Sequence, residues 1–99
     1  MDLKTMQASA ERASDLLKLL GHPRRSMLVC ELRKGEKSVN ELAEIIGISQ
    51  SSVSQHLARM RYQDVVLARR DGKTVYYSLK GGTASLLIAS LNRIFNPVP

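Results

Sequence analysis

Apolar residues in the middle of the chain recur at helical spacing, and polar residues fill the positions between them. The clearest case is residues 49–62, SQSSVSQHLARMRY. When each residue advances about 100° around a helix, Val53, Leu57 and Met60 fall within about 40° of one another. The pattern predicts an amphipathic helix with a thin apolar stripe inside. Its opposite face carries small or hydrogen-bonding side chains: Ser51, Ser54, Gln55, Ala58 and Tyr62.

The preceding residues predict a second helix and a tight turn. Ser38 is a good N-cap, and Glu41 three residues later completes a capping box for a helix over 39–46. Gly47 ends that helix, and Ser49 caps the next one. A capped helix, a glycine turn and a helix with a polar face together predict a helix-turn-helix unit at about 38–62.

Two further helices are predicted upstream of this unit. The first spans 7–20, ends at Gly21, and carries an apolar stripe of Ala10, Ala13, Leu16, Leu17 and Leu20. The second spans 23–33 and begins with a proline, whose missing N–H has no cost at the first helical position. Residues 34–37 are expected to form a polar turn.

A β-hairpin is predicted downstream. The β-rich runs 65–70 and 73–79 flank Asp71-Gly72, the dipeptide most typical of a hairpin turn. A hairpin that follows a helix-turn-helix is a wing, here at about 65–79. Basic residues surround its tip, and we expect them to contact phosphates or the minor groove rather than only to aid solubility: Arg69, Arg70 and Lys73.

After a Gly81-Gly82 hinge, residues 83–95 predict a last helix that is too apolar to be a free surface helix. We expect it to pair with the 7–20 helix of a second copy; the alternative is packing on its own core alone. Residues 96–99 are expected to be extended. The fold class is therefore mainly α with a β-hairpin wing, a dimeric winged helix-turn-helix in a single domain over 1–99.

Charge supports a polyanionic partner. The net charge is +6 over 99 residues, and residues 50–99 hold seven Lys/Arg against two Asp/Glu. The lone cysteine excludes an internal disulfide and fits a reducing cytoplasm. There is no run long enough to span a membrane, and no signal peptide is recognisable. No nucleophile elbow, phosphate loop or catalytic triad pattern is present, so the sequence does not predict an enzyme.

Taken with this order of elements, GHPRR after the first helix, SVNELAEIIGISQSSVSQHLARMR and TVYYSL resemble the ArsR/SmtB family of bacterial winged-helix repressors, in the branch of HlyU, BigR and NolR. The resemblance implies a cytoplasmic, nucleoid-associated homodimer that binds an imperfect palindrome in promoter DNA. It implies that bases are contacted by Gln50, Ser51, Ser54 and Gln55. His56 and Arg59 would brace the DNA backbone, and His56 is equally well explained as a half-buried structural histidine.

The metal sites of the family are not matched here. The positions of its Cys-x-Cys read Ser38-Val39-Asn40, and residues 83–95 contain no Asp, Glu, His or Cys. The two histidines, His22 and His56, lie in separate elements. Since zinc requires about four nitrogen, sulfur or oxygen ligands and copper(I) prefers thiolates, neither a metal nor another cofactor is predicted.

The sequence therefore does not identify the signal to which the protein responds. In the redox branch of the family a cysteine of the second helix joins one near the end of the last; Cys30 matches the first position, and Asn96 occupies the second. Cys30 is a candidate thiol sensor without a resolving partner, or a small core residue. The sequence is also compatible with a ligand-independent regulator or anti-repressor that competes for DNA, and with a winged-helix protein-interaction module.

Overall fold

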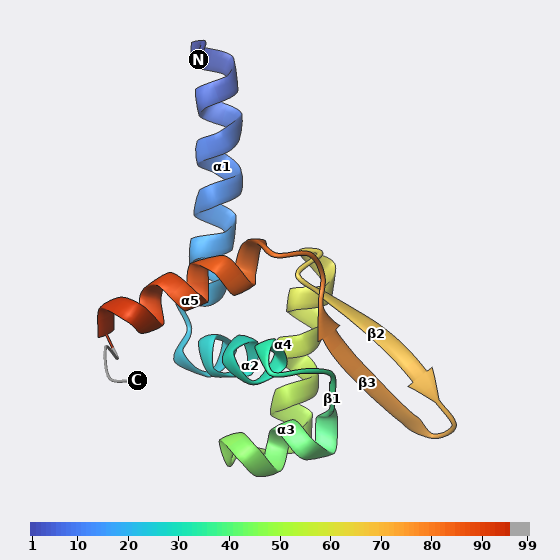
Figure 1. The fold of residues 1–99 in the computed structure, drawn as a ribbon. Helices are drawn as coiled ribbons and strands as arrows, with labels where there is room; N and C mark the ends of the chain where they lie inside the picture. Colours follow the sequence, from blue (N-terminus) through green and yellow to red (C-terminus); the bar gives the residue numbers. More distant parts are fainter. Residues whose placement is uncertain (96–99) are drawn as a thin grey trace.

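The computed structural model describes residues 1–95 and shows five helices and three strands in that range (Figure 1). The elements in chain order are α1 Leu3–Leu20, α2 Pro23–Arg33, β1 Lys37–Ser38, α3 Val39–Ile46, α4 Gln50–Tyr62, β2 Val66–Asp71, β3 Thr74–Leu79 and α5 Thr83–Phe95. The fold class is confirmed: a mainly helical chain carries an antiparallel hairpin as a wing. The expected extended tail at 96–99 lies outside the described residues.

The core forms where α2, α3 and α4 meet the base of the wing and one side of α5. Val53, Leu57 and Met60 are each 0% exposed, so the stripe predicted for the polar helix is confirmed. They pack in one cluster with Leu28 of α2 and Leu42 of α3. Burial of each such side chain contributes about 1.5–3 kcal/mol, which holds α4 rigidly while its other face stays in solvent.

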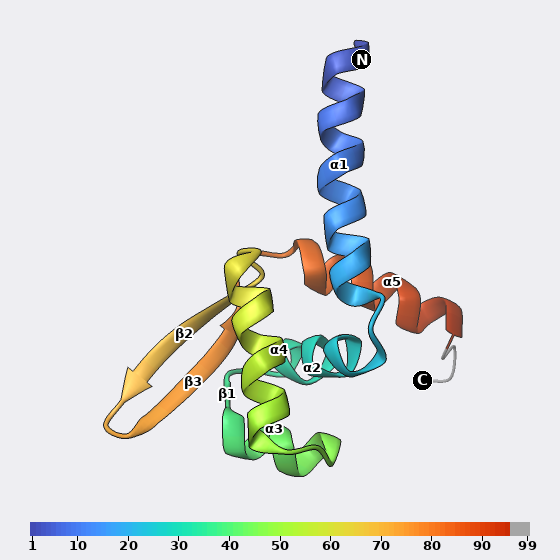
Figure 2. The ribbon, with the colours of Figure 1, turned by 180° about the vertical axis from the view of Figure 1, so that it is seen from behind.

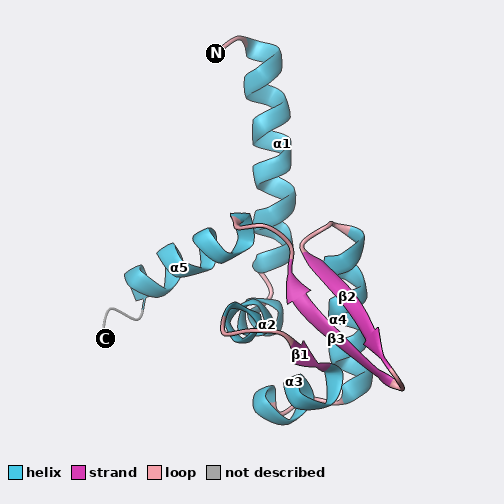
Figure 3. Ribbon diagram, turned by 45° about the vertical axis from the view of Figure 1, so that its right-hand side comes forward, coloured by secondary structure: helices cyan, strands magenta, loops and turns pink. Residues whose placement is uncertain are grey.

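The sheet has one strand more than the sequence predicted. Residues Lys37–Ser38, at the end of the expected polar turn, form β1 and pair with β3, so the strand order is β1-β3-β2. Figure 3 shows the long hairpin extending beyond this short edge strand. A two-residue strand has almost no pattern of its own; only its partner reveals it.

The hairpin turn lies one residue later than expected. Asp71 pairs with Thr74, so the two loop residues are Gly72 and Lys73 rather than Asp71 and Gly72. Gly72 has φ +63°, the conformation that a two-residue hairpin loop needs at its first central position. Lys73 therefore sits at the outermost point of the wing.

Helix α1 is longer than predicted and projects away from the body (Figures 1 and 2). It begins at Leu3, because the Asp2 carboxylate accepts a 2.7 Å hydrogen bond from the Thr5 amide as an N-cap. Only its C-terminal end reaches the core, where Leu19 is 2% exposed and Leu16 packs against the cluster. Leu19 was missing from the predicted stripe, whereas Leu17, which belonged to it, is 55% exposed.

Helix α5 is apolar on more than one side. Ala84 and Ile88 are buried against the core, beside α2. Leu86 is 71% exposed and Phe95 80% exposed. Packing of α5 on its own core alone therefore accounts for only one of its faces.

Candidate DNA-binding surface

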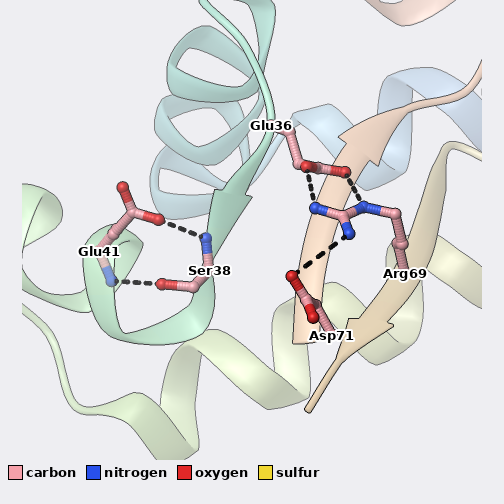
Figure 4. A network of polar contacts seen from close by, with 5 residues as sticks. All are labelled: Glu36, Ser38, Glu41, Arg69 and Asp71. Atoms are coloured by element: carbon pink, nitrogen blue, oxygen red, sulfur yellow. Dashed lines mark hydrogen bonds and ion pairs between the residues drawn. The ribbon is translucent and has the colours of Figure 1, made fainter. Parts of the chain in front are cut away.

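The turn between α3 and α4 is held by a chain of local hydrogen bonds. The Ser38 amide donates to Glu41 Oε1 at 3.0 Å, and the Glu41 amide donates to Ser38 Oγ at 3.1 Å, so the predicted capping box is present (Figure 4). The hydrogen bond from the Ser38 amide is the chief cause that lowers the pKa of the Glu41 carboxyl. Gly47, with φ +80°, closes the helix by donating to the Ala43 carbonyl at 2.9 Å.

Helix α4 then starts from Ser49, whose Oγ accepts from the Ser52 amide at 3.0 Å. The outward face of α4 is in solvent, as the pattern predicted. Four polar residues of its first two turns are exposed: Gln50, Ser51, Ser54 and Gln55. An amide side chain offers a donor and an acceptor together, the arrangement that matches an adenine edge in the major groove. Because the inner face is fully buried, these groups are presented on a rigid support.

His56 takes the half-buried position that the sequence left as one of two explanations. Its ring centroid lies 4.8 Å from that of His22, at the start of α2. Burial chiefly, and then His22 and nearby arginines, lower the pKa of His56. His22 Nδ1 accepts the Arg24 amide at 3.2 Å as the N-cap of α2. Arg59, one turn beyond His56, is exposed.

The three basic residues of the wing differ in their surroundings. Arg69 donates to both carboxylate oxygens of Glu36, through Nη2 at 2.7 Å and Nε at 3.1 Å (Figure 4). These hydrogen bonds lower the pKa of Glu36. The side chains of Arg70 and Lys73 are exposed and form no ion pair within residues 1–95. The sequence pattern groups all three basic residues and places Glu36 in a polar turn, because no spacing rule links two residues that lie 33 positions apart.

Cys30 is half-buried on α2 and faces α5. Its Sγ lies 3.9 Å from Oδ1 and 3.7 Å from Nδ2 of Asn92. Asn96, the position expected for a second cysteine, lies outside the described residues. Over residues 1–95, no group of three or more His, Cys, Asp or Glu side chains comes close enough to hold a metal ion. No helix in that range is both long and apolar enough to cross a membrane.

A rigid helix with a polar outer face, set beside a basic hairpin, defines the winged helix-turn-helix class of DNA-binding proteins. The sequence profile described as "Bacterial regulatory protein, arsR family" matches residues 22–67. The chain is 40% identical to the HTH-type transcriptional regulator YgaV of Escherichia coli, over 97% of this chain and 98% of that protein. It is 36% identical to the transcriptional activator HlyU of Vibrio cholerae, over 96% and 88%.

Solved structures of transcriptional regulators share the fold of this chain. The transcriptional repressor BigR from Xylella fastidiosa superimposes with a TM-score of 0.87 at 42% identity, covering 96% of this chain and 97% of that one. The homodimeric winged helix-turn-helix domain of Mb0332 from Mycobacterium bovis gives 0.80 at 26% identity, over 97% and 87%. The chain belongs to the ArsR family, in the branch of HlyU and BigR, and is a transcriptional regulator with a DNA-binding winged helix rather than an enzyme.

Proposed function

We propose that the protein acts as a homodimer that binds an imperfect palindrome in bacterial promoter DNA. The observation that carries this proposal is the outer face of α4, where polar side chains at the surface stand on a fully buried apolar stripe. Such a face suits base edges in a major groove, and two copies related by a two-fold axis would read half-sites about one helical turn apart.

The proposed DNA contacts fall into two chemical groups, contacts to bases and contacts to phosphates. Gln50, Ser51, Ser54 and Gln55 read bases, since their side chains both donate and accept hydrogen bonds. Arg59 and the wing-tip cations Arg70 and Lys73 contact phosphates, which carry no sequence information but supply affinity. His56, on α4, packs against His22 at the start of α2 and adds at most a backbone contact at its exposed edge.

The dimer proposal rests on apolar surface that this chain leaves uncovered. Leu17 of α1 and Leu86 of α5 are 55% and 71% exposed. A hollow of about 520 Å³ lies between these helices, lined by Arg12, Ala13, Leu16, Leu17, Thr83 and Leu87. Exposed apolar surface of this kind marks association sites, and the Mb0332 domain, a structural neighbour, is homodimeric. A second copy with the same two helices would cover both.

Two further points concern the signal to which the protein responds and whether it represses or activates transcription. Relatives include the repressor BigR and the activator HlyU, so membership of this branch is compatible with either sign of regulation. We propose a protein of the bacterial cytoplasm and nucleoid that responds through Cys30 or through abundance and competition for DNA. The Cys30 contact with Asn92 favours the thiol response, because an adduct on Sγ would press between α2 and α5.

The test is a binding titration of the purified protein against duplex DNA from its own upstream region. It is run reduced, then after peroxide or polysulfide, with a chelator throughout, and repeated over a range of salt. We expect binding with a log–log salt slope on the order of −6 to −10, since a dimer neutralises several phosphates.

Loss of binding on oxidation would support the thiol response, and indifference would support control by abundance or competition. If neither this DNA nor duplexes selected from a random pool are bound in preference to bulk DNA, the proposal is wrong. The alternative of a winged-helix protein-interaction module would then remain, although a docking helix usually shows apolar anchors on its outer face.

A further inference from the structure

One side chain of the wing crosses the whole sheet. Arg69 lies on β2, and Glu36 lies just before β1, on the opposite edge. Two nearly parallel hydrogen bonds, 2.7 Å from Nη2 and 3.1 Å from Nε, join the guanidinium to the two carboxylate oxygens (Figure 4). This fork-to-fork geometry is more specific in direction than a single charged contact.

Strand register explains how the contact forms. Arg69 pairs with Tyr76 of β3, and Tyr76 pairs with Ser38 of β1, so the three residues lie in one row across the sheet. Outer strands on either side of a central one are about 10 Å apart. Arg69 spans this distance by lying over the Tyr76 ring, with its guanidinium carbon 4.9 Å from the ring centroid. A lysine could not reproduce the fork.

The far end of the contact lies at the start of the helix-turn-helix. Glu36 is two residues before Ser38, the N-cap of α3, whose capping box with Glu41 fixes the direction of that helix. Beyond β1 the wing is an isolated two-stranded ribbon, and such ribbons are only marginally stable on their own. The Arg69–Glu36 contact therefore connects the outer strand of the wing to the segment that orients α3 and α4.

Charge sets Arg69 apart from the other basic residues of the wing. Its guanidinium faces Glu36 and, with Nη1 3.9 Å from Oδ2, Asp71. Two carboxylates face this one guanidinium, so Arg69 itself attracts a phosphate less than an unpaired cation would. Arg70 and Lys73 form no ion pair in the described part of the chain.

We propose that Arg69 is a positioning residue: with Glu36 it fixes the wing relative to the helix-turn-helix, and Arg70 and Lys73 alone supply the phosphate contacts of the wing. This inference deepens the proposed function, on which it rests, and gives Arg69 a different role from the DNA contact that the sequence predicts for all three cations. It identifies Glu36, an acidic residue, as one that promotes binding to a polyanion.

The direction in which one substitution changes the DNA affinity tests this proposal. Glu36→Gln removes one negative charge and breaks the fork. Glu44→Gln, on the exposed side of α3, removes the same charge outside the network and serves as the matched control. Each full-length variant is titrated by fluorescence anisotropy against the duplex that the wild-type protein selects from a random pool, over a range of salt.

If Glu36 braces the wing, Glu36→Gln binds about two- to fivefold more weakly than wild type with an unchanged salt slope, while Glu44→Gln binds equally or more tightly. If Glu36 merely restrains a phosphate-binding Arg69, Glu36→Gln binds more tightly and its salt slope steepens by about one unit for each additional phosphate that is neutralised. That second result would overturn the proposal.

A DNA-free measurement separates this inference from the proposed function. Hydrogen exchange of the wing amides in the free protein should accelerate in Glu36→Gln and in Arg69→Lys, while amides of α2 keep their wild-type rates. The swapped variant carrying Glu36→Arg and Arg69→Glu should recover protection, because the pair is restored in reverse. Unchanged wing exchange in both single variants would refute the brace even if DNA binding held.

Discussion

The imidazole rings of His22 and His56 lie 4.8 Å apart, centroid to centroid, where the start of α2 meets the middle of α4. His22 Nδ1 accepts a hydrogen bond from the Arg24 amide and so caps α2. Burial is the largest cause that disfavours the charged form of His56, followed by the nearby His22, Arg25, Arg24 and Arg59. The contact couples the protonation of His56 to the packing of α4 against the start of α2.

Stability should therefore fall in mild acid. The pKa of His56 is lowered in the folded protein, chiefly by burial, so the unfolded chain takes up this proton first as the pH drops. The free energy of unfolding should be fully retained above the ordinary histidine pKa of about 6.5 and decrease below it. Urea unfolding across this range measures the effect, and His56→Asn should flatten the decrease.

His22→Asn supplies the control, because asparagine can still cap α2 while the neighbouring imidazole is removed. The pKa of His56, followed by its ring proton resonance, should move part of the way back toward its ordinary value. A pKa of His56 at or above about 6.5 in the wild-type protein would contradict the packing argument.

Replacing Gln55 by Ala should reduce discrimination between operators. If the Gln55 amide pairs with one base, its loss removes about 1–3 kcal/mol of preference at that position and little affinity for other sequences. Binding to a panel of single-base operator variants measures this. Equal weakening on every duplex would show that Gln55 does not read a base.

Replacing Arg70 by Ala should instead weaken binding to all sequences alike. A phosphate contact contributes through counterion release, so the salt slope should become shallower by about one unit for each phosphate that is no longer neutralised. Lys73→Ala should behave the same way, since both side chains lie at the exposed end of the wing. An altered base preference in either variant would argue against a phosphate role.

Leu17→Glu should convert the proposed dimer into a monomer. The side chain lines the hollow between α1 and α5 and is 55% exposed in the single chain, so the fold of each copy should survive. Sedimentation at micromolar concentration gives the mass, and circular dichroism checks the helix content. Leu67→Glu, on a wing residue 50% exposed, is the control that should stay dimeric. A monomeric wild-type protein would refute the dimer itself.

Cys30→Ser decides between a sensor and a core residue. If the thiol responds to peroxide or polysulfide, the variant should bind DNA normally and lose the response. If Cys30 only packs between α2 and α5, the reduced and treated wild-type proteins should bind alike, and the variant should show only a modest loss of stability. A full response retained in Cys30→Ser would exclude thiol sensing.

The sequence by itself determined the elements whose signals are local. The capping box of Ser38 and Glu41, the left-handed Gly47 and the stripe of α4 involve residues at most a few positions apart, so short-range rules locate them. The polar outer face of α4, on which the proposed function rests, follows from the same periodicity.

Only the tertiary structure decided the relationships between distant segments. The strand at Lys37–Ser38 exists because Tyr76 and Tyr77 pair with it, and Arg69 differs from Arg70 because Glu36 faces only one of them. Contacts of this kind depend on how separate elements pack, and the free energy of packing is not encoded in any short window of residues. The sequence alone therefore predicted a basic wing, and the fold showed which of its cations is already paired.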